Sequence, residues 1–357
     1  MQPITQPFTQ PPSSGEVVTI CPGVLWARMP LPIALDHINV YLIDTGEGWI
    51  IIDTGMKGEE GRHCWQRIID NHLCGKPVVG VLATHMHPDH IGQAGWLVDK
   101  YRVPFYMTMA EYFQARSFSI PNSRPISWRS EQYYRRSGLN QEQIAAVSKV
   151  MARFSKVVEP LPNNYVRLSD GQWLQWGEHR WQVVVGRGHS PEHACLYCPS
   201  MKILLAGDQV IADITPNVSV IPVEPDGEPL RQWFESIERF KLLDDDVLVL
   251  PSHKLPFYGL HQRLEDIRQH HENHLNDLLA ATVSPKSAVE LLPVLFKRSI
   301  ADGVLTLALG ECVAHLHELI LRGCMERVLV DDVYLFRALT ESTQSPSSSS
   351  QADHLSV

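Results

Sequence analysis

Hydrophobic and polar positions follow two different spacings along the first third of the chain. The stretches HINVYLID (37–44) and GWIIIDTG (48–55) are β-branched runs joined by the turn TGEG, and they predict a β-hairpin. In EEGRHCWQRIIDNHL, the side chains of Trp65, Ile68, Ile69 and Leu73 fall on one side of a helix. A buried strand, KPVVGVLA, and a further helix, IGQAGWLVDK, come next. Elements in this order predict a layered α/β fold.

Residues from about 106 to 160 interrupt this rhythm with a helical, aromatic and basic segment. Between Tyr112 and Glu159, eight arginine and lysine side chains stand against three glutamates. We expect a helical insert between two strands of a sheet, which could act as a lid. A solvated helical surface explains the same composition equally well.

Strand patterns return in YVRL, QWLQW, RWQVVVG, HACLYC and KILLAGD. The helix EPLRQWFESIERFKLL, the strand DVLVLPSH and the long helix LHQRLEDIRQHHENHLNDLLAA follow, and GCMERVLVDDVYLFRAL predicts a small two-stranded wing. We therefore divide the chain into a disordered arm (1–16), a main domain (17–282), a small second domain (283–340) and a disordered tail (341–357). No repeat of fixed period is present.

Composition narrows the class of protein. The chain has 357 residues, of which 44% are hydrophobic and 20% charged, as in ordinary globular proteins. The net charge of -9 argues against nucleic acid as a partner. The first residues lack the basic start and apolar core of a signal peptide, and no apolar run reaches the ~20 residues of a membrane span. We expect a cytoplasmic protein.

The seven cysteines do not form a disulfide framework, because they are scattered and odd in number. Cys195 and Cys198 form a C-x-x-C pair inside a predicted strand, and no second pair completes a four-cysteine zinc site. We expect both to be buried thiols.

The densest chemistry lies in THMHPDHIGQAG (84–95), directly after a predicted strand. Four side chains that commonly bind metals fall within six positions: His85, His87, Asp89 and His90. Neutral imidazole and carboxylate suit zinc, and also iron or manganese. A solvated loop is the alternative, but ligand sites of layered α/β folds lie at such strand ends.

The same arrangement recurs three times downstream. VVVGRGHSPEH presents His189, ILLAGDQ presents Asp208 and VLVLPSHKLPF presents His253, each just after a hydrophobic strand. Isolated surface residues would not follow strand ends so regularly. The pattern predicts that these side chains join the first group in a metal site.

The order H-x-H-x-D-H, G-H-S-P, G-D and P-S-H resembles the metallo-β-lactamase-fold hydrolase superfamily over about residues 17 to 280. The resemblance implies a four-layer αβ/βα sandwich with two metals, zinc or else manganese or iron, at one edge. It implies the following ligands: His85, His87 and His189 on the first metal, Asp89, His90 and His253 on the second, and Asp208 on both. Asp53, in IIIDTG, would orient the metal loop from behind.

The aspartate in G-D indicates a branch similar to glyoxalase II and related thioesterases, lactonases and phosphodiesterases, because true β-lactamases typically carry a cysteine there. The C-terminal segment resembles the winged-helix tail of a lactamase-fold subgroup. From Lys286 to Arg337 its acids outnumber its bases by one, so we expect it to pack, dimerise or shape the cleft, not to bind a duplex.

Two loops depart from the family pattern. Glu192 stands where many relatives have glycine, and PSHKLPF replaces the commoner P-G-H-G, so that Lys254 and Phe257 should crowd the cleft mouth. His193 is expected to be structural, with a polar contact to the site as the alternative. Our candidate substrate contacts are Arg135, Arg136, Lys254 and Tyr258.

These expectations converge on a metal-dependent hydrolase of thioesters, esters or lactones. A metal-activated hydroxide would attack the carbonyl, with Asp89 orienting it and accepting its proton. Arginines and aromatic residues of the insert would hold an anionic tail such as that of an acyl-CoA. A phosphodiesterase or endoribonuclease with the same metals is the main alternative, and an oxygenase, lyase or degenerate binding protein is a third. We expect a small-molecule substrate, no membrane partner, and leave a homodimer open.

Overall fold

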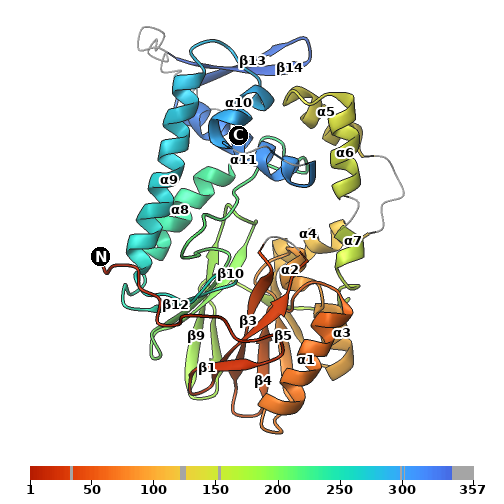
Figure 1. Cartoon of the computed structure of the whole chain (residues 1–357), viewed down its shortest axis with the longest axis vertical. Coiled ribbons are helices and arrows are strands. Elements are labelled where there is room, and N and C mark those ends of the chain that lie inside the picture. Colours follow the sequence, from red (N-terminus) through yellow and green to blue (C-terminus); the bar gives the residue numbers. More distant parts are fainter. Residues whose placement is uncertain (33–34, 121–125, 152–153, 298–299, 301, 340–357) are drawn as a thin grey trace, which may run out of the picture.

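The computed structural model describes the chain except residues 33–34, 121–125, 152–153, 298–299, 301 and 340–357 (Figure 1). Its centre is a pair of β-sheets. The first sheet has the order β1-β2-β3-β4-β5-β6-β7. These strands are β1 (Val17–Cys21), β2 (Val24–Pro30), β3 (His37–Asp44), β4 (Trp49–Ile52), β5 (Val78–Leu82), β6 (Phe105–Thr108) and β7 (Val166–Leu168). Pairing is antiparallel up to β4 and parallel from β4 to β7.

The second sheet has the order β12-β11-β10-β9-β8. It contains β8 (Trp173–Trp176), β9 (His179–Gly186), β10 (His193–Cys198), β11 (Ile203–Gly207) and β12 (Leu248–Pro251). Only β11 and β12 are parallel neighbours in it. Each predicted strand of both sheets is therefore present, and the 37–55 hairpin is β3–β4. Strands β1 and β2 were not predicted.

The alternation of side chains along single strands shows how the layers stack. In β3, Val40 and Leu42 belong to the core beneath helix α1 (Glu59–His72), whereas Tyr41 and Ile43 belong to the core between the sheets. In β10, Cys195 faces the outer helices and Leu196 faces the other sheet. Side chains of one strand point to opposite faces in turn, so both sheets are covered on both sides. The expected four-layer αβ/βα sandwich is confirmed.

Helices cover the two outer faces. The first sheet carries α1, α3 (Ala94–Tyr101) and α4 (Met109–Ser119), and the short helix α2 (Pro88–Ile91) lies at its edge. The second sheet carries α8 (Pro229–Phe240) and α9 (Leu260–Ala281). The predicted helices correspond to α1, α3, α8 and α9. Cys195 and Cys198 are buried free thiols in separate cores, as expected of structural residues.

A small domain follows α9, at the top of Figure 1. It contains α10 (Ala288–Leu295), a 3-10 turn (Asp302–Val304), α11 (Leu305–Leu321) and an antiparallel pair, β13 (Met325–Val330) and β14 (Val333–Ala338). The predicted two-stranded wing is this pair. Its helices share one apolar core with α8 and α9, so the small domain is joined to the main one through buried contacts.

The insert differs from its expected form in two ways. Its first residues form β6 and not a helix, and the helices begin at α4. Helices α5 (Trp128–Arg136) and α6 (Gln141–Met151) then leave the sheet and pack on the small domain, while α7 (Phe154–Val157) returns toward α4 (Figure 1). Tyr133 donates to the Val220 carbonyl and Val289 to the Ser137 carbonyl. These contacts fix α5 and α6 on the small domain.

The N-terminal arm was expected to be disordered, and the structure contradicts this. Thr5 and Tyr258 exchange two backbone hydrogen bonds, and the Phe8 ring packs edge-on against Trp26 at 5.4 Å between centroids. Ser14 contacts the Cys64 thiol. Composition alone did not reveal these partners, because they lie far away in the sequence. The predicted disordered tail, 341–357, lies outside the described residues. Among the described helices, none is long and apolar enough to cross a membrane.

Candidate metal centre

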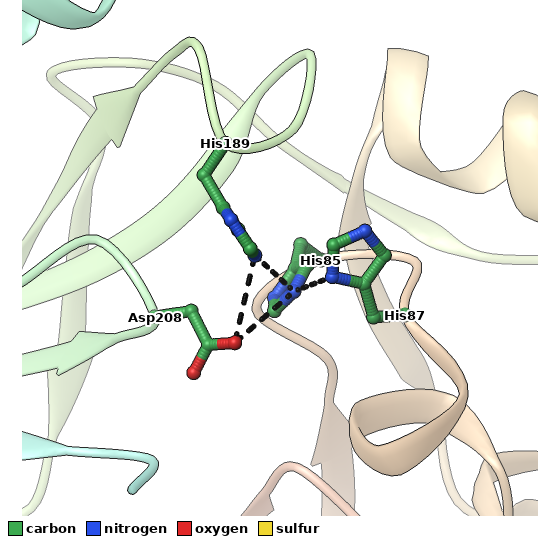
Figure 2. A group of neighbouring side chains, drawn as sticks. All are labelled: His85, His87, His189 and Asp208. Carbon is green, nitrogen blue, oxygen red and sulfur yellow. Dashed lines mark hydrogen bonds and ion pairs between the residues drawn. The ribbon is translucent and has the colours of Figure 1, made fainter. Parts of the chain in front are cut away.

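Ligand-type side chains from both sheets meet at one edge of the sandwich. His85 and His87 follow β5, His189 follows β9, Asp208 follows β11 and His253 follows β12. Figure 2 shows residues from the loops of the two sheets pointing toward one another across the edge. Each strand ends in a loop that is free to turn its side chain inward, and the sheet core beneath holds the loops in place.

The first cluster contains three imidazoles and one carboxylate (Figure 2). His85 Nε2 lies 2.8 Å from His87 Nδ1 and 3.3 Å from His189 Nε2. Asp208 Oδ2 lies 3.5 Å from His189 Nε2 and 3.9 Å from His85 Nε2. Four donor atoms therefore face one small volume.

The second cluster contains Asp89, His90 and His253. Asp89 Oδ2 lies 3.3 Å from His253 Nε2 and 3.7 Å from His90 Nε2. Asp208 reaches this group as well, with Oδ1 3.5 Å from His253 Nε2 and Oδ2 3.4 Å from His90 Nε2. Asp208 is thus the side chain common to both clusters, and all seven predicted ligands come together.

The donor set fits two metal ions. Ligands at about 2.0–2.2 Å from a tetrahedral ion stand about 3.3–3.6 Å apart, which is the range of most separations above. His90 Nε2 and Asp208 Oδ1 are buried and have no hydrogen-bond partner among the described residues. Buried polar atoms without partners are costly, and buried carboxylates are normally paired or bound to a metal.

The electrostatics divide the histidines into two groups. Burial and neighbouring imidazoles lower the pKa of His85 well below its usual value and that of His87 to about 3, so their lone pairs are available at neutral pH. Burial also acts on His90, but the carboxylates of Asp53, Asp208 and Asp89 outweigh it and raise its pKa well above the usual value. This surplus of negative charge favours a cation at the second cluster.

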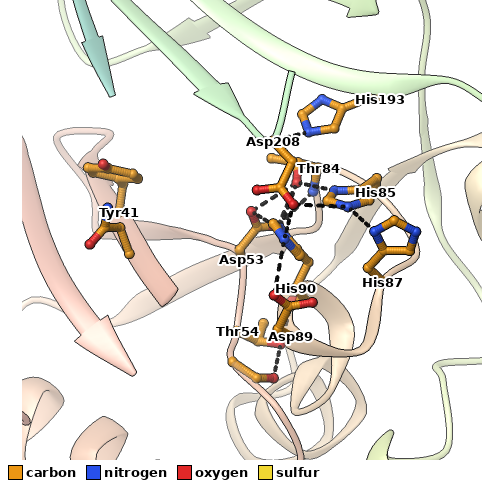
Figure 3. A network of polar contacts seen from close by, with 12 residues as sticks. Tyr41, Asp53, Thr54, Thr84, His85, His87, Asp89, His90, His193 and Asp208 are labelled. Atoms are coloured by element: carbon orange, nitrogen blue, oxygen red, sulfur yellow. Dashed lines mark hydrogen bonds and ion pairs between the residues drawn. The ribbon is translucent and has the colours of Figure 1, made fainter. Parts of the chain in front are cut away.

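Asp53 holds the metal loop from behind, as Figure 3 shows. Its Oδ2 accepts from His90 Nδ1 at 2.8 Å, and its Oδ1 accepts from the Thr84 backbone N–H at 2.8 Å. The Thr84 hydroxyl donates to Asp53 and lies 3.1 Å from His85 Nδ1. Fixing these Nδ1 atoms turns Nε2 of both rings toward the metal positions. The orienting role implied for Asp53 therefore has a geometric basis, and Thr84 is an addition to it.

His193 performs a similar task for Asp208. The Asp208 backbone N–H donates to His193 Nε2 at 3.0 Å, and His193 is fully buried. Gly207 has φ +53°, and a Cβ there would lie 2.4 Å from the His193 ring, so this position requires glycine. His193 is the structural residue we expected, placed beneath the shared carboxylate.

Backbone carbonyls orient two further ligands. His189 Nδ1 donates to the Asn217 carbonyl at 2.8 Å, and His253 Nδ1 donates to the His37 carbonyl at 3.2 Å. Sequence reasoning missed Asn217, because no motif surrounds it. It also missed Glu111, a fully buried residue of α4. The Glu111 carboxylate accepts from the backbone N–H groups of Met86 (3.0 Å) and Glu192 (2.7 Å), which ties the two ligand loops together.

A cavity of about 650 Å³ opens beside the clusters. Its lining includes His87, Asp89, His189, Asp208 and His253, and many apolar side chains. The apolar residues are Leu35, Met86, Pro88, Ala110, Pro191, Ile211, Ile214, Pro216, Ile221, Val223, Pro229 and Leu307. The ligands therefore face a space large enough for a small molecule.

The candidate substrate contacts are not brought to this cavity. Arg135 and Arg136 pair with Asp332 between β13 and β14, at 3.2 and 3.4 Å. Lys254 and Tyr258 are absent from the described lining. Phe257, expected at the cleft mouth, is fully buried in the core instead. The loop after His253 turns inward at Lys254, whose φ is +68°. Spacing along the sequence could not show this turn.

Comparison with known families agrees with the geometry. The family described as "Metallo-beta-lactamase superfamily" matches residues 33–253, and "Metallo-beta-lactamase-like, C-terminal domain" matches residues 275–339. The chain belongs to the metallo-β-lactamase superfamily. A crystal structure of a β-lactamase domain protein from Burkholderia ambifaria is similar with a TM-score of 0.86 and 38% identity, covering 94% of this chain and 98% of that one. Both domains of this superfamily member are thus of known type.

Curated relatives are more distant. The chain is 22% identical to the "Probable metallo-hydrolase YqjP" of Bacillus subtilis (strain 168), over 82% of this chain and 91% of that protein. It is 27% identical to the "Acyl-coenzyme A thioesterase MBLAC2" of Bos taurus, over 53% of this chain and 63% of that protein. Identity to the "Hydroxyacylglutathione hydrolase" of Francisella tularensis subsp. novicida (strain U112) is 25% over 31% of this chain and 45% of that protein, which does not assign the chain to a glyoxalase II-like branch.

Proposed function

We propose that this superfamily member is a dinuclear zinc hydrolase that cleaves a thioester, ester or lactone. The observation that carries the proposal is the shared position of Asp208 between two clusters that line one cavity. Two imidazole-rich clusters joined by a carboxylate suit a pair of zinc ions. When bound, such a pair lowers the pKa of water and polarises a carbonyl oxygen.

The chain's own residues would orient the reactants. His85, His87 and His189 would hold one ion, Asp89, His90 and His253 the other, and Asp208 both. Asp89 uses Oδ2 toward His253 and His90, which leaves its second carboxylate oxygen to receive a proton from water. The apolar wall of the cavity limits competing water and would contact an acyl group.

The cavity favours a carbonyl substrate with an apolar part over a phosphodiester. Among its described lining residues the one arginine or lysine is Arg187, and Glu192 and Glu224 lie in the same lining. A polyanionic backbone would need several basic contacts. The sequence similarity to an acyl-coenzyme A thioesterase adds support for the thioester version. Arg187 could then meet an anionic portion of the substrate.

A turnover panel on metal-loaded, full-length protein tests this function. The panel contains a medium-chain acyl-CoA followed by thiol release, an aliphatic lactone and bis-p-nitrophenyl phosphate. We expect kcat/KM for a carbonyl substrate to exceed that for the phosphodiester by at least about tenfold, a difference of roughly 1.4 kcal/mol. Faster phosphodiester cleavage would favour the phosphodiesterase alternative instead. Activity that persists after chelation would exclude a metal-dependent reaction.

A further inference from the structure

A second group of histidines lies between α9 and α11, outside the two clusters of the metal centre. Three come from α9, namely His270, His271 and His274, and His315 comes from α11 together with Glu311. Their rings are close, with centroids 4.2 Å apart for His270–His274 and 5.2 Å apart for His271–His315. We call this group the helix cluster.

His270, His274 and Glu311 have the arrangement of a metal site. The two histidines are four residues apart, which places them on one face of α9. One ligand atom from each of the three residues lies within 4.8 Å of the others. Histidines at this helical spacing with a carboxylate from a second element form the donor set of known zinc sites that keep an open position.

Of the other two histidines, His315 has both ring nitrogens hydrogen-bonded, whereas His271 Nε2 is buried without a partner among the described residues. His315 Nδ1 donates to the Glu311 carbonyl at 2.7 Å, and His271 Nδ1 donates to His315 Nε2 at 3.1 Å. His274 Nδ1 is buried and has no hydrogen-bond partner in the described part of the chain. His270 and His274 are half-buried, so an ion could reach them from solvent.

Among the described residues, no lysine, arginine or histidine forms an ion pair with the Glu311 carboxylate. It is 9% exposed, and its recorded side-chain contact is the Asn217 amide, which donates to Oε2 at 2.7 Å. Burial raises the pKa of Glu311 to about 7. Arg263 is the charged residue that acts on His270, but its guanidinium donates to the carbonyls of Ile211 and Ile214. A buried carboxylate beside neutral imidazoles is stabilised by a bound cation.

We propose that His270, His274 and Glu311 bind a third divalent ion, of the zinc class, in addition to the pair in the metal centre. The ion would join α9 to α11. It would also fix Glu311, whose partner Asn217 uses its backbone carbonyl to hold His189 Nδ1. The third ion therefore stabilises the small domain and helps to position one ligand of the catalytic pair.

Metal counting on full-length protein tests the proposal. Protein stripped with chelator is reloaded with zinc, desalted and measured by mass spectrometry, with zinc titration by calorimetry alongside. We expect wild-type protein to carry one more ion per chain than His270→Ala or His274→Ala. Glu311→Gln keeps an acceptor for Asn217 and should lose the same ion. His63→Ala, an exposed histidine on α1, is the matched control and should lose none.

A background that lacks the carboxylate shared by the two clusters makes the count independent of the proposed activity. In Asp208→Ala protein the helix cluster should still bind zinc, and the double variant Asp208→Ala/His274→Ala should bind one ion fewer. Circular dichroism identifies any variant that fails to fold. If the histidine variants fail to fold, the zinc content of Glu311→Gln tests the proposal. The proposal is overturned if the folded His274 and Glu311 variants carry as much zinc as wild type in both backgrounds.

Discussion

The metal centre and the helix cluster use the same side chains but are built differently. In the centre, ligands stand on loops after β-strands or, for Asp89 and His90, on the short helix α2, and separate partners such as Asp53, Asn217 and His193 fix them from behind. In the helix cluster, ligands stand on α9 and α11, and helix packing sets their spacing, with one further hydrogen bond from Asn217 to Glu311. The loops can aim seven side chains at two adjoining points. The helices can bring three together, with less freedom to adjust.

The largest expected difference follows from removing the central carboxylate of the metal centre. Asp208→Ala takes a donor from both clusters and leaves His90 and His253 without it. We expect activity to fall by more than about a hundredfold, which exceeds the loss expected when a residue that only hydrogen-bonds to a metal ligand is replaced. Steady-state kinetics with zinc in excess measure it.

Glu311→Ala is the comparison for this prediction. It should lower zinc content by one ion and reduce activity only modestly, because Glu311 acts on His189 through Asn217. If both variants abolish activity to the same extent, the two clusters are not functionally distinct.

A smaller effect is expected from replacing Asp53, which holds the metal loop from behind. Asp53→Asn keeps the size of the side chain but weakens the hydrogen bond to His90 Nδ1. We expect activity and zinc affinity to fall by about 10- to 100-fold with little change in secondary structure. Zinc titration of the centre, in a His274→Ala background, gives the affinity. Unchanged affinity would show that His90 is oriented by the loop backbone alone.

The centre could be predicted from the sequence because each ligand follows a strand in a short motif. That the seven residues from His85 to His253 meet follows from strand ends that share one edge, whereas their division between two metals came from the resemblance to the family. Glu111, Thr84 and Asn217 were missed, since a buried glutamate, a threonine hydroxyl or a backbone carbonyl that accepts a hydrogen bond has no local pattern. The helix cluster was missed for a related reason: His271 and His274 meet His315 only through the packing of α9 on α11.

In the fold as well, elements with a local sequence pattern were predicted, whereas contacts between segments remote in sequence were not. Strands and helices with clear periodicity were predicted, and the β13–β14 pair was as well. The packing of α5 and α6 on the small domain was not predicted. Nothing in the sequence around their arginines indicates that Asp332 and Tyr334 are the partners. The contacts of the N-terminal arm were not predicted either, since Trp26 and Tyr258 are remote from it in sequence.

A third prediction compares two basic positions. Arg187 lines the cavity beside the centre, whereas Arg135 is held at the small domain by Glu131 and Asp332. Arg187→Glu should raise KM for an anionic thioester by about tenfold, the effect of losing one charge-assisted contact of roughly 1.4 kcal/mol, with kcat less affected. Arg135→Glu should leave KM unchanged. The reverse result would place the anionic tail on α5 after all.

The last expected effect is on stability and not on activity, and its sign depends on whether an ion is bound at the helix cluster. In metal-free protein, Glu311 has a pKa of about 7 in place of 4.5. Below pH 4.5 the Glu311 carboxyl is protonated in both the folded and the unfolded chain, so there is no buried charge to destabilise the folded state. Between pH 4.5 and 7 the unfolded chain releases this proton first, and above pH 7 the folded state is destabilised by up to about 3 kcal/mol.

Glu311→Gln removes this penalty without removing the acceptor for Asn217. It should therefore raise the melting temperature of metal-free protein at pH 8 by a few degrees and leave it unchanged at pH 4.5. With zinc the sign should reverse at pH 8, because the amide is a poorer ligand than the carboxylate. Thermal melts in chelator and in zinc measure both. Because an uncoordinated Glu311 would give the same sign in both conditions, reversal is specific to an ion bound at the helix cluster.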